Sequence, residues 1–472
     1  MKKTVFITKI VLAFILLLML NSWKSFSEEK KTDEVKANPP NVLIIMADDC
    51  TFKDLPIYGG KNVKTPNIDK LASQSMVFDK AYVSMSMCTP SRSELFTGLY
   101  PMRSGVAFNH SKAKPGTKSV VQQLGKLGYR TGIAGKIHVG PEDVFAFEKV
   151  EGIERNCVSL TANYDSAGML DFVTKDPGPF CLLATLVVPH EPWTVGDYKH
   201  FDLDKLILPP YMADTPDTRL CYAKYLAEIE VLDIQVGKTL DMLEKSGKLK
   251  NTIVIFTSEQ GSQFPFNKWT NWDMGLHTGF MVRWPNNVKS GIRTDALIQY
   301  ADVLPTLVDA ANGTFDDGEF DGKSFLKVLT GEKTTHRDFA YAMHNNIPEG
   351  PEYPIRSITD GKHRYIRNLK NETFYIEKHL MGAMPENQYW PSWIFESGNN
   401  QKTFSLINRY MNRPEEEFYN TAEDEYELNN LAKNTNYLEI KSKLSKELDK
   451  WMTQQNDLGA VIDTWEVFNN SK

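Results

Sequence analysis

The order of hydrophobic patterns along the 472-residue chain predicts an α/β fold, with one large mixed sheet flanked by helices. Uninterrupted apolar runs of strand length alternate with amphipathic segments of helix length over the first three-quarters of the chain. After about Thr335 the composition changes, and aromatic residues, prolines and turn residues dominate. We therefore expect a large domain over residues 38–334 and a smaller C-terminal α+β domain over residues 335–472.

The first 27 residues have the three-part layout of a secretory signal peptide. Lysines precede an apolar run at residues 10–20, and the small residues Ser25 and Ser27 follow it. This run is shorter than the roughly 20 residues that span a bilayer, although an uncleaved anchor stays open as an alternative. We expect cleavage at residue 27, no stable membrane span, and a secreted or periplasmic location in a Gram-negative bacterium.

Charge and cysteine usage narrow the class of partner. Removing the four lysines of residues 1–27, which contain no acid, changes the formal charge from −6 to −10. An acidic surface argues against nucleic acid as a partner. An anionic substrate would instead need locally clustered Lys, Arg and His side chains. Five cysteines in a chain of this length exclude a disulfide scaffold, although one pair could bridge.

The strands of the large sheet are predicted by apolar runs that would be buried on both faces. They lie at residues 41–47, 130–134, 180–188 and 251–257. Apolar residues at three- and four-residue steps predict the helices between them. These cover residues 68–77, 120–127, 217–246 and 303–311, and Gly247 ends the third. The C-terminal part has short strand candidates at 364–369 and 373–376 and a helix at 437–451.

Polar side chains follow three of these strands at the point where each strand ends. Asp48 and Asp49 follow the first, His190 follows the third, and Glu259 and Gln260 follow the fourth. Ligands of open α/β sheets bind outside the carboxyl ends of the strands, so we expect these residues in one site. The four acid and amide side chains contain only oxygen donors suited to a hard cation, which favours calcium ahead of magnesium.

Residues 86–92, Ser-Met-Cys-Thr-Pro-Ser-Arg, with Leu-Phe-Thr-Gly at 95–98, resemble the Cys-x-Pro-x-Arg signature of formylglycine-dependent sulfatases. The resemblance implies that a separate maturing enzyme oxidises Cys88 to formylglycine (3-oxoalanine). One hydroxyl of the hydrated aldehyde would attack sulfur as the alcohol leaves, and the other would expel sulfate as the aldehyde re-forms. The alternative is a buried structural cysteine before a proline turn.

A second stretch, residues 128–141, resembles the second signature of the same family, with Ile137 where a larger residue is usual. The resemblance implies that Lys136 contacts sulfate and that His138 assists sulfate release. His190, in 188–193, matches the histidine that protonates the leaving group, and a lone structural histidine is the alternative. Lys268 matches the lysine that binds a sulfate oxygen, although it follows Gln260 at short spacing. Arg92 would orient the formylglycine.

The same resemblance implies one Ca²⁺ held by Asp48, Asp49, Glu259, Gln260 and the oxidised Cys88. The family usually has Asp followed by Asn or His where this chain has Glu259 and Gln260. Each of these side chains is one methylene longer, which calcium tolerates better than magnesium does. The departure leaves the assignment of individual ligands open.

Residues 135–141 and 353–357 look like the N-sulfoglucosamine sulfohydrolase (heparan N-sulfatase) branch and its bacterial relatives, and 413–419 with 427–431 look like bacterial sulfatase C-terminal segments. The resemblance covers nearly the whole chain after residue 27 and implies an alkaline-phosphatase-like fold. It implies hydrolysis of sulfate esters or sulfamates on a sulfated polysaccharide or its oligosaccharides, algal (such as ulvan) or heparan-type. His277, His344 and Arg356 are candidates for sugar recognition, or else ordinary core or surface residues.

Two other functions compete with the sulfatase interpretation. A phosphodiesterase or phosphonate hydrolase of the same superfamily is one, but two-zinc members need a second ligand set, and only one set is found here. An inactive sulfated-glycan-binding homologue is the other. Against it stands the joint presence of six residues, which are Cys88, Arg92, Lys136, His138, His190 and Lys268.

Overall fold

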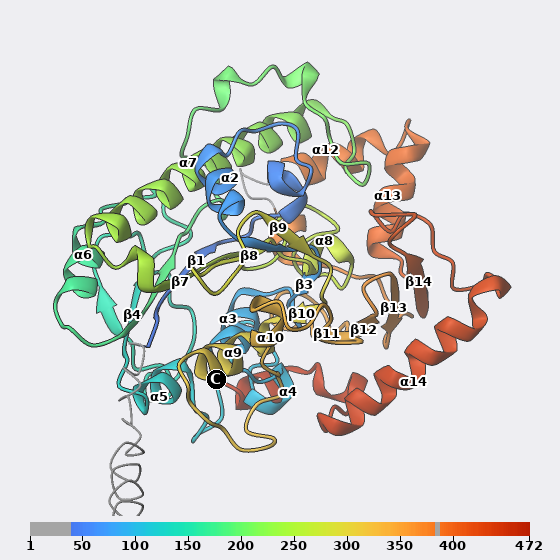
Figure 1. Ribbon diagram of the computed structural model, residues 1–472. Coiled ribbons are helices and arrows are strands. Elements are labelled where there is room, and N and C mark those ends of the chain that lie inside the picture. Colours follow the sequence, from blue (N-terminus) through green and yellow to red (C-terminus); the bar gives the residue numbers. More distant parts are fainter. Residues whose placement is uncertain (1–38, 383–387) are drawn as a thin grey trace, which may run out of the picture. The chain divides into compact units, whose positions relative to one another are not determined.

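The computed structural model, which describes residues 39–382 and 388–472, is built around an eight-stranded mixed sheet (Figure 1). The strand order is β5-β4-β6-β1-β7-β8-β2-β9. The first five of these strands are mutually parallel, while β8 runs antiparallel to β7 and β2. The strands are β1 (Asn41–Ala47), β2 (Met76–Phe78), β4 (Arg130–Gly135), β5 (Glu148–Val150), β6 (Phe180–Thr185), β7 (Thr252–Ser258), β8 (Phe280–Arg283) and β9 (Ile292–Thr294). Two further strands, β3 (Ala81–Tyr82) and β10 (Ile298–Gln299), form a separate parallel pair.

Both faces of the large sheet are buried, as the uninterrupted apolar runs predicted. In β1 the alternate residues Leu43 and Ile45 join one hydrophobic cluster, and Val42 and Ile44 join another. The long helix α7 (Pro216–Lys245) contributes its apolar stripe to the first cluster. Helix α9 (Val303–Ala310) and helix α5 (Val120–Gly125) contribute to the second. The sheet is therefore covered by helices on both sides.

Capping residues explain where the long helix begins and ends. The side chain of Thr215 accepts the backbone N–H of Thr218, and Pro216 occupies the first turn. Gly247, which follows the helix, has φ +72°, a left-handed conformation that terminates helices. The other helices of this part are α2 (Pro66–Ser73), α3 (Cys88–Thr97), α4 (Pro101–Ser104), α6 (Ala167–Thr174), α8 (Asp273–Leu276) and α10 (Leu326–Leu329).

A second, antiparallel sheet forms after residue 335. It contains β11 (Ala340–His344), β12 (Ile355–Thr359), β13 (His363–Asn368) and β14 (Glu416–Asn420), in that order. Helix α14 (Leu438–Gln454) packs Leu444, Leu448 and Trp451 into the same cluster as residues of this sheet. The remaining helices are α11 (Lys378–Met381), α12 (Tyr389–Glu396), α13 (Gln401–Met411) and α15 (Trp465–Asn470). Pro40–Lys472 group as one compact unit, and the division at residue 335 stays a prediction.

Most predicted elements are confirmed, with two differences. The helix predicted over 68–77 ends at Ser73, because the chain turns there and residues 76–78 join the large sheet as β2. Residues 373–376 form no strand, since β12 and β14 already occupy both edges of β13. The predicted signal peptide, residues 1–27, lies outside the described residues. Within the described part of the chain, no helix combines the length and apolar character needed to cross a bilayer. None of the five cysteines, which all lie in the described part of the chain, forms a disulfide.

Gly135, the last residue of β4, is placed where only glycine fits. Its φ is +97°, and a Cβ there would lie 2.0 Å from the carbonyl oxygen of Thr185. That oxygen accepts the N–H of Lys136. We expect Gly135→Ala to lower the free energy of unfolding by at least about 3 kcal/mol, since the left-handed conformation and the clash add. Gly128→Ala is the matched control, with φ +82° and open space around it, and it should cost only about 1–2 kcal/mol. Equal urea midpoints for the two variants would contradict the clash argument.

Candidate active site

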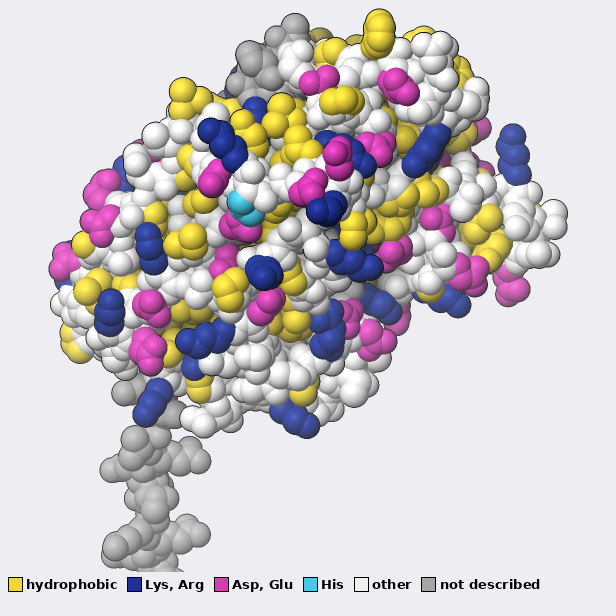
Figure 2. All heavy atoms as spheres, turned by 90° about the horizontal axis from the view of Figure 1, so that it is seen from above, with side chains coloured by type: hydrophobic (Ala, Val, Ile, Leu, Met, Phe, Trp, Pro, Cys, Tyr) yellow, Lys and Arg dark blue, Asp and Glu magenta, His cyan; other side chains and the backbone are white. Residues whose placement is uncertain are grey.

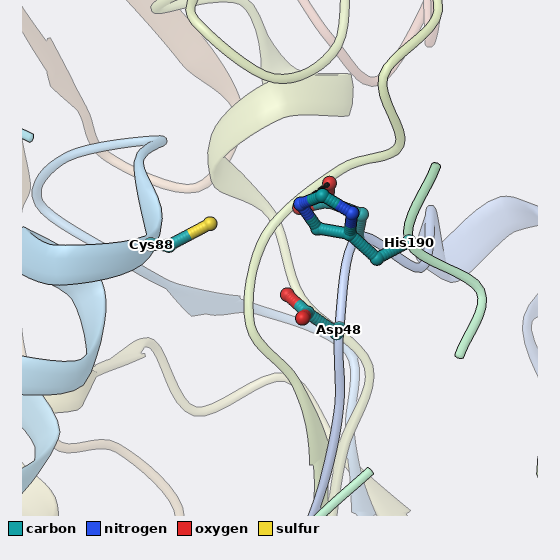
Figure 3. Close-up of side chains that lie close together, drawn as sticks. Asp48, Cys88 and His190 are labelled. Carbon is teal, nitrogen blue, oxygen red and sulfur yellow. Dashed lines mark ion pairs between the residues drawn. The ribbon is translucent and has the colours of Figure 1, made fainter. Parts of the chain in front are cut away.

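The residues predicted to form the site meet at the carboxyl edge of the large sheet. The potential ligand atoms of Asp48, Asp49, Cys88 and His190 all lie within 4.8 Å of one another. Figure 3 shows the thiol of Cys88, the carboxylate of Asp48 and the imidazole of His190 pointing toward a common space from three different segments. Cys88 is the first residue of α3, so its side chain lies at a helix N-terminus. Side chains far apart in sequence are thus gathered by the strand order.

Each carboxylate of this cluster is paired with a buried cation. The Nζ of Lys136 lies 2.7 Å from Asp48 Oδ2, and the Nζ of Lys268 lies 2.8 Å from Asp49 Oδ2. Arg92 binds Glu259 through Nε and Nη2, at 2.7 and 3.1 Å. Its third nitrogen, Nη1, donates to the backbone oxygen of Lys136 at 2.7 Å. Arg92 therefore links α3 to the ends of β4 and β7. Its guanidinium nitrogens are used in these contacts.

Gln260 connects the acidic residues with the nucleophile segment. Its amide nitrogen donates to Asp49 Oδ1 at 2.6 Å and lies 3.5 Å from Cys88 Sγ. Its amide oxygen accepts the hydroxyl of Ser91 at 3.0 Å. This geometry fixes the amide of Gln260 beside the thiol of Cys88. Gln260 is one of the two positions at which the sequence departs from the family pattern.

The thiol of Cys88 is buried, yet its pKa lies well below the ordinary value. Burial and the negative charge of Glu259 both raise this pKa. The nearby Lys136 and Lys268, together with His138, lower it by more. The pocket around residue 88 therefore stabilises negative charge.

His190 stands at the opposite side of the cluster. Its Nε2 lies 3.4 Å from Asp49 Oδ2, and its Nδ1 contacts the backbone oxygen of Glu191. Burial lowers the pKa of His190, but Asp49 and Asp48 raise it well above the ordinary value. This shift favours the protonated imidazole, which suits a proton donor.

His138 and His110 form a pair on another wall of the site. The Nε2 of His138 lies 3.0 Å from Nδ1 of His110. The Nδ1 of His138 is buried and has no hydrogen-bond partner among the described residues. His138 also has a left-handed backbone, with φ 50°. Such a buried unpaired nitrogen is available to a group that the site binds or forms.

A pocket of about 350 Å³ opens over Cys88. His138, His190 and Lys268 line it, as predicted residues of the site. It is also lined by residues that sequence reasoning missed, namely Asn109, His110, Gln263, Trp269, His379 and the segment around Leu160. Most of them lie in loops without a periodic pattern, and His379 lies in the short helix α11. No signal in a single sequence would have singled them out, except that polar and aromatic loop residues often carry function.

The three residues predicted to recognise sugar have other partners in the structure. His344 is fully buried and bonds Asn346, and Arg356 is fully buried and paired with Asp457. His277 stacks on Phe52, with ring centroids 3.8 Å apart, and lines a different cleft. None of the three lines the pocket over Cys88, so their role in sugar binding stays a prediction that the geometry does not favour.

The donor set fits a hard divalent cation. Asp48, Asp49 and Glu259 supply carboxylates and Gln260 supplies an amide, which are ligands suited to calcium. Three cations already balance the three acids, so a divalent ion would give the site the excess positive charge that an anionic substrate needs. Arg92 engages both oxygens of Glu259 and Lys136 both oxygens of Asp48, while the amide oxygen of Gln260 accepts from Ser91, so an ion would take over contacts that these oxygens now make within the protein.

This positive charge is local. On the face shown in Figure 2, Lys and Arg side chains are interspersed with Asp and Glu, and no broad field of one sign is visible. The basic residues that matter are the buried ones around Cys88, as the overall acidic charge led us to expect.

Comparisons with known proteins agree with this site. The family model described as Sulfatase matches residues 40–314, and the model described as N-sulphoglucosamine sulphohydrolase, C-terminal, matches residues 261–376. An ulvan-active sulfatase of Formosa agariphila is 31% identical, over 89% of this chain and 81% of the relative. Human N-sulphoglucosamine sulphohydrolase is 27% identical, over 89% of this chain and 91% of the relative.

A solved structure of a protein in complex with its substrate, D-glucosamine-2-N,6-O-disulfate, has the same fold. Its TM-score is 0.67 at 20% sequence identity, and the match covers 89% of this chain and 99% of the other. The large mixed sheet with its helices and the C-terminal antiparallel sheet thus agree with the alkaline-phosphatase-like fold that the motifs implied. With the Sulfatase model covering more than half of the chain and all of the clustered residues, the protein belongs to the sulfatase family.

Proposed function

We propose that this sulfatase removes sulfate groups, as esters or sulfamates, from a sulfated polysaccharide or its oligosaccharides, of algal (such as ulvan) or heparan type. The observation that carries the proposal is the position of Cys88. It lies at the N-terminus of α3, within one pocket with His138, His190 and Lys268. The named activities of the ulvan-active and N-sulphoglucosamine relatives support the substrate class.

The roles of the side chains follow from their charge and position. Lys136 and Lys268 neutralise negative charge beside Cys88, so they are suited to hold sulfate oxygens. His190 faces the cluster, and its raised pKa suits it to give a proton to the leaving oxygen or nitrogen. The unpaired Nδ1 of His138 is suited to accept a proton from a hydroxyl at residue 88. Arg92 acts through Glu259 and the backbone of Lys136, as a positioning residue.

Two groups that the family implies would complete this chemistry. Oxidation of Cys88 by a maturing enzyme to formylglycine, which hydrates to two hydroxyls on one carbon, would supply both a nucleophile and a route for sulfate release. A calcium ion held by Asp48, Asp49, Gln260, Glu259 and the oxidised residue 88 would polarise the sulfate oxygens. Mass spectrometry of the tryptic peptide that contains Cys88, after co-expression with a maturing enzyme, tests the modification.

An assay of an aryl sulfate beside the matching aryl phosphate and phosphonate tests the reaction class. We expect turnover of the sulfate to exceed that of the other two by orders of magnitude. A faster reaction with phosphate or phosphonate would favour a phosphodiesterase or phosphonate hydrolase instead. Turnover of none of the three by protein that carries formylglycine would favour an inactive glycan-binding homologue. Product masses from defined heparan-derived and algal oligosaccharides then identify the sugar and the sulfate position.

Removal of calcium should reduce both activity and stability. An ion that binds only the folded state stabilises it by about 2.7 kcal/mol at one hundred times its dissociation constant. We therefore expect dialysis against a chelator to lower the melting temperature and to abolish aryl sulfate turnover. Added Ca²⁺ should restore both, and Mg²⁺ should restore less because its octahedral geometry suits the longer arms of Glu259 and Gln260 poorly. Unchanged melting and turnover after chelation would contradict the metal assignment.

The signal-like segment supports a location outside the cytoplasm. We propose export through the Sec pathway, with cleavage at residue 27, into the periplasm or the medium. N-terminal sequencing of the protein recovered from cell fractions tests this, because an uncleaved chain retained with the cells would contradict it.

A further inference from the structure

A network of side chains from the C-terminal part of the chain reaches the wall of the catalytic pocket, and no step of the proposed reaction uses it. Its centre is Glu349, whose side chain is fully buried in the loop after β11. Its Oε2 accepts Nε2 of His379 at 2.6 Å and lies 3.0 Å from Nζ of Lys378. Its Oε1 accepts Nδ2 of Asn109 at 3.0 Å. His379 and Asn109 both line the pocket over Cys88.

The network is continuous with the nucleophile segment. Asn109 Oδ1 accepts the hydroxyl of Thr89, the residue after Cys88, at 3.1 Å. Asn109 Nδ2 also lies 3.2 Å from His110, and His110 pairs with His138. Glu349 therefore fixes two pocket walls at once, one through Asn109 and one through His379.

His379 is held in one orientation from several sides. Its ring lies parallel to Trp269, at 12° with centroids 5.3 Å apart. Its backbone N–H donates to Glu377 Oε1 at 2.9 Å, because Glu377 is the N-cap of α11. Its Nδ1 has no hydrogen-bond partner among the described residues, and its side chain is 43% exposed at the pocket. A fixed imidazole with one nitrogen on a carboxylate and the other open is arranged to donate to a ligand.

The charge of this wall favours an anion. Although burial opposes it, hydrogen bonding to Glu349 and the charges of Glu377 and Glu349 raise the pKa of His379. Burial also opposes ionisation of Glu349, yet His379, Asn109 and Lys378 lower its pKa to about 2. The pocket is lined by five basic side chains and by one acidic side chain, Glu191. Three of the five, His138, His190 and Lys268, have roles at the sulfate that is removed. His110 and His379 remain, and His110 is turned to His138.

A metal ion is a poorer occupant of this cluster, although Glu349, Glu377 and His379 lie within reach of one another. Glu349 already accepts Asn109 and His379 and pairs with Lys378. Glu377 accepts the backbone N–H groups of His379 and Leu380. These lone pairs and charges are thus already satisfied within the protein.

We propose that His379, positioned by buried Glu349 beside Trp269, binds a second anionic group of the substrate sugar. This inference rests on the proposed sulfatase function and deepens it, since it predicts that the preferred substrate carries a carboxylate or a further sulfate besides the sulfate that is removed. The shared chemistry is an oxyanion that accepts the Nδ1–H of a protonated imidazole.

Calorimetry on the calcium-loaded full chain with Cys88→Ala tests the proposal, because this variant binds without turnover. The probes are two matched pairs. The first is N,6-O-disulfated glucosamine against N-sulfated glucosamine, and the second is a sulfated disaccharide with a uronic acid against the same compound with its carboxyl reduced to an alcohol. We expect the more anionic member of at least one pair to bind about tenfold more tightly, as for one charge-assisted hydrogen bond. Preference in the first pair identifies a sulfate, and preference in the second a carboxylate.

Adding His379→Gln should bring the affinities for the two members of that pair to within about twofold of each other. His379→Lys, which keeps a positive charge, should retain part of the preference. Glu349→Gln should weaken it as well. His200→Gln is the matched control, because His200 also pairs with a glutamate, Glu230, and lies outside the pocket. Equal affinities within both pairs, affinities too weak to measure, or a preference that survives His379→Gln would overturn the proposal. Aryl sulfate turnover by the wild type, measured in parallel, reports separately on the proposed function.

Discussion

Replacement of Cys88 by alanine should lower kcat for an aryl sulfate by a factor on the order of 10⁴ or more, with the fold intact. Removal of a nucleophile costs this much because the remaining groups only bind and polarise the substrate. The loss should be large in this protein, since Lys136, Lys268, His138 and Gln260 all surround the side chain at residue 88. Alanine removes the group on which they converge and leaves their own charge pairs in place.

The measurement is single-turnover release of sulfate and of the aryl alcohol, with the melting temperature recorded on the same sample. Cys221→Ala is the matched control, because Cys221 is a buried thiol in α7 and lies outside the pocket. It should lower stability slightly and leave turnover unchanged. If Cys88→Ala kept wild-type turnover, the proposed mechanism would be refuted.

The large sheet was predictable because each of its central strands carries a strong local signal. Residues 41–47 and 252–258 are apolar without interruption, and burial on both faces requires such runs. The clustering of the polar residues directly after these strands was predictable as well, since the carboxyl ends of parallel strands share one edge. The two polar pairs and His190 were therefore expected in one cluster by position, and Cys88 by its motif. Neither depended on knowing long-range contacts.

The sugar-binding wall was not predictable for the opposite reason. His379 and Glu349 are separated from Cys88 by more than 250 residues and carry no periodic pattern. Of the three residues chosen from sequence, His277, His344 and Arg356, only Arg356 lies in a family-like stretch, and their partners turned out to be Asp273, Asn346 and Asp457. A charged side chain in a motif can serve the packing of a loop as well as a ligand, and one sequence does not separate these uses. The strand predicted at 373–376 failed similarly, because available sheet edges are a property of the whole fold.

One buried arginine links the C-terminal sheet to helix α8. Arg364 of β13 lies 2.8 Å from Glu427 through Nε and 2.5 Å from Asp273 of α8 through Nη2. All three side chains are buried. Burial raises the pKa of Glu427 to about 7, whereas His277 and Arg364 overcome burial and lower the pKa of Asp273. The guanidinium is therefore the shared counter-charge of two buried carboxylates, of which Asp273 also pairs with His277.

Arg364→Met should lower the free energy of unfolding by about 3–5 kcal/mol, the usual cost of leaving buried charges unpaired. Arg367→Met on the same strand is the matched control, since Arg367 pairs with the exposed Asp449 and should cost at most about 1 kcal/mol. Without Arg364, the folded-state pKa values of both acids rise above their unfolded values of about 4, so the folded form takes up protons there. The deficit should consequently be smaller at pH 5 than at pH 8, as measured by urea unfolding of both variants. A deficit that is independent of pH, or equal to that of Arg367→Met, would show that the arginine contributes packing and not charge.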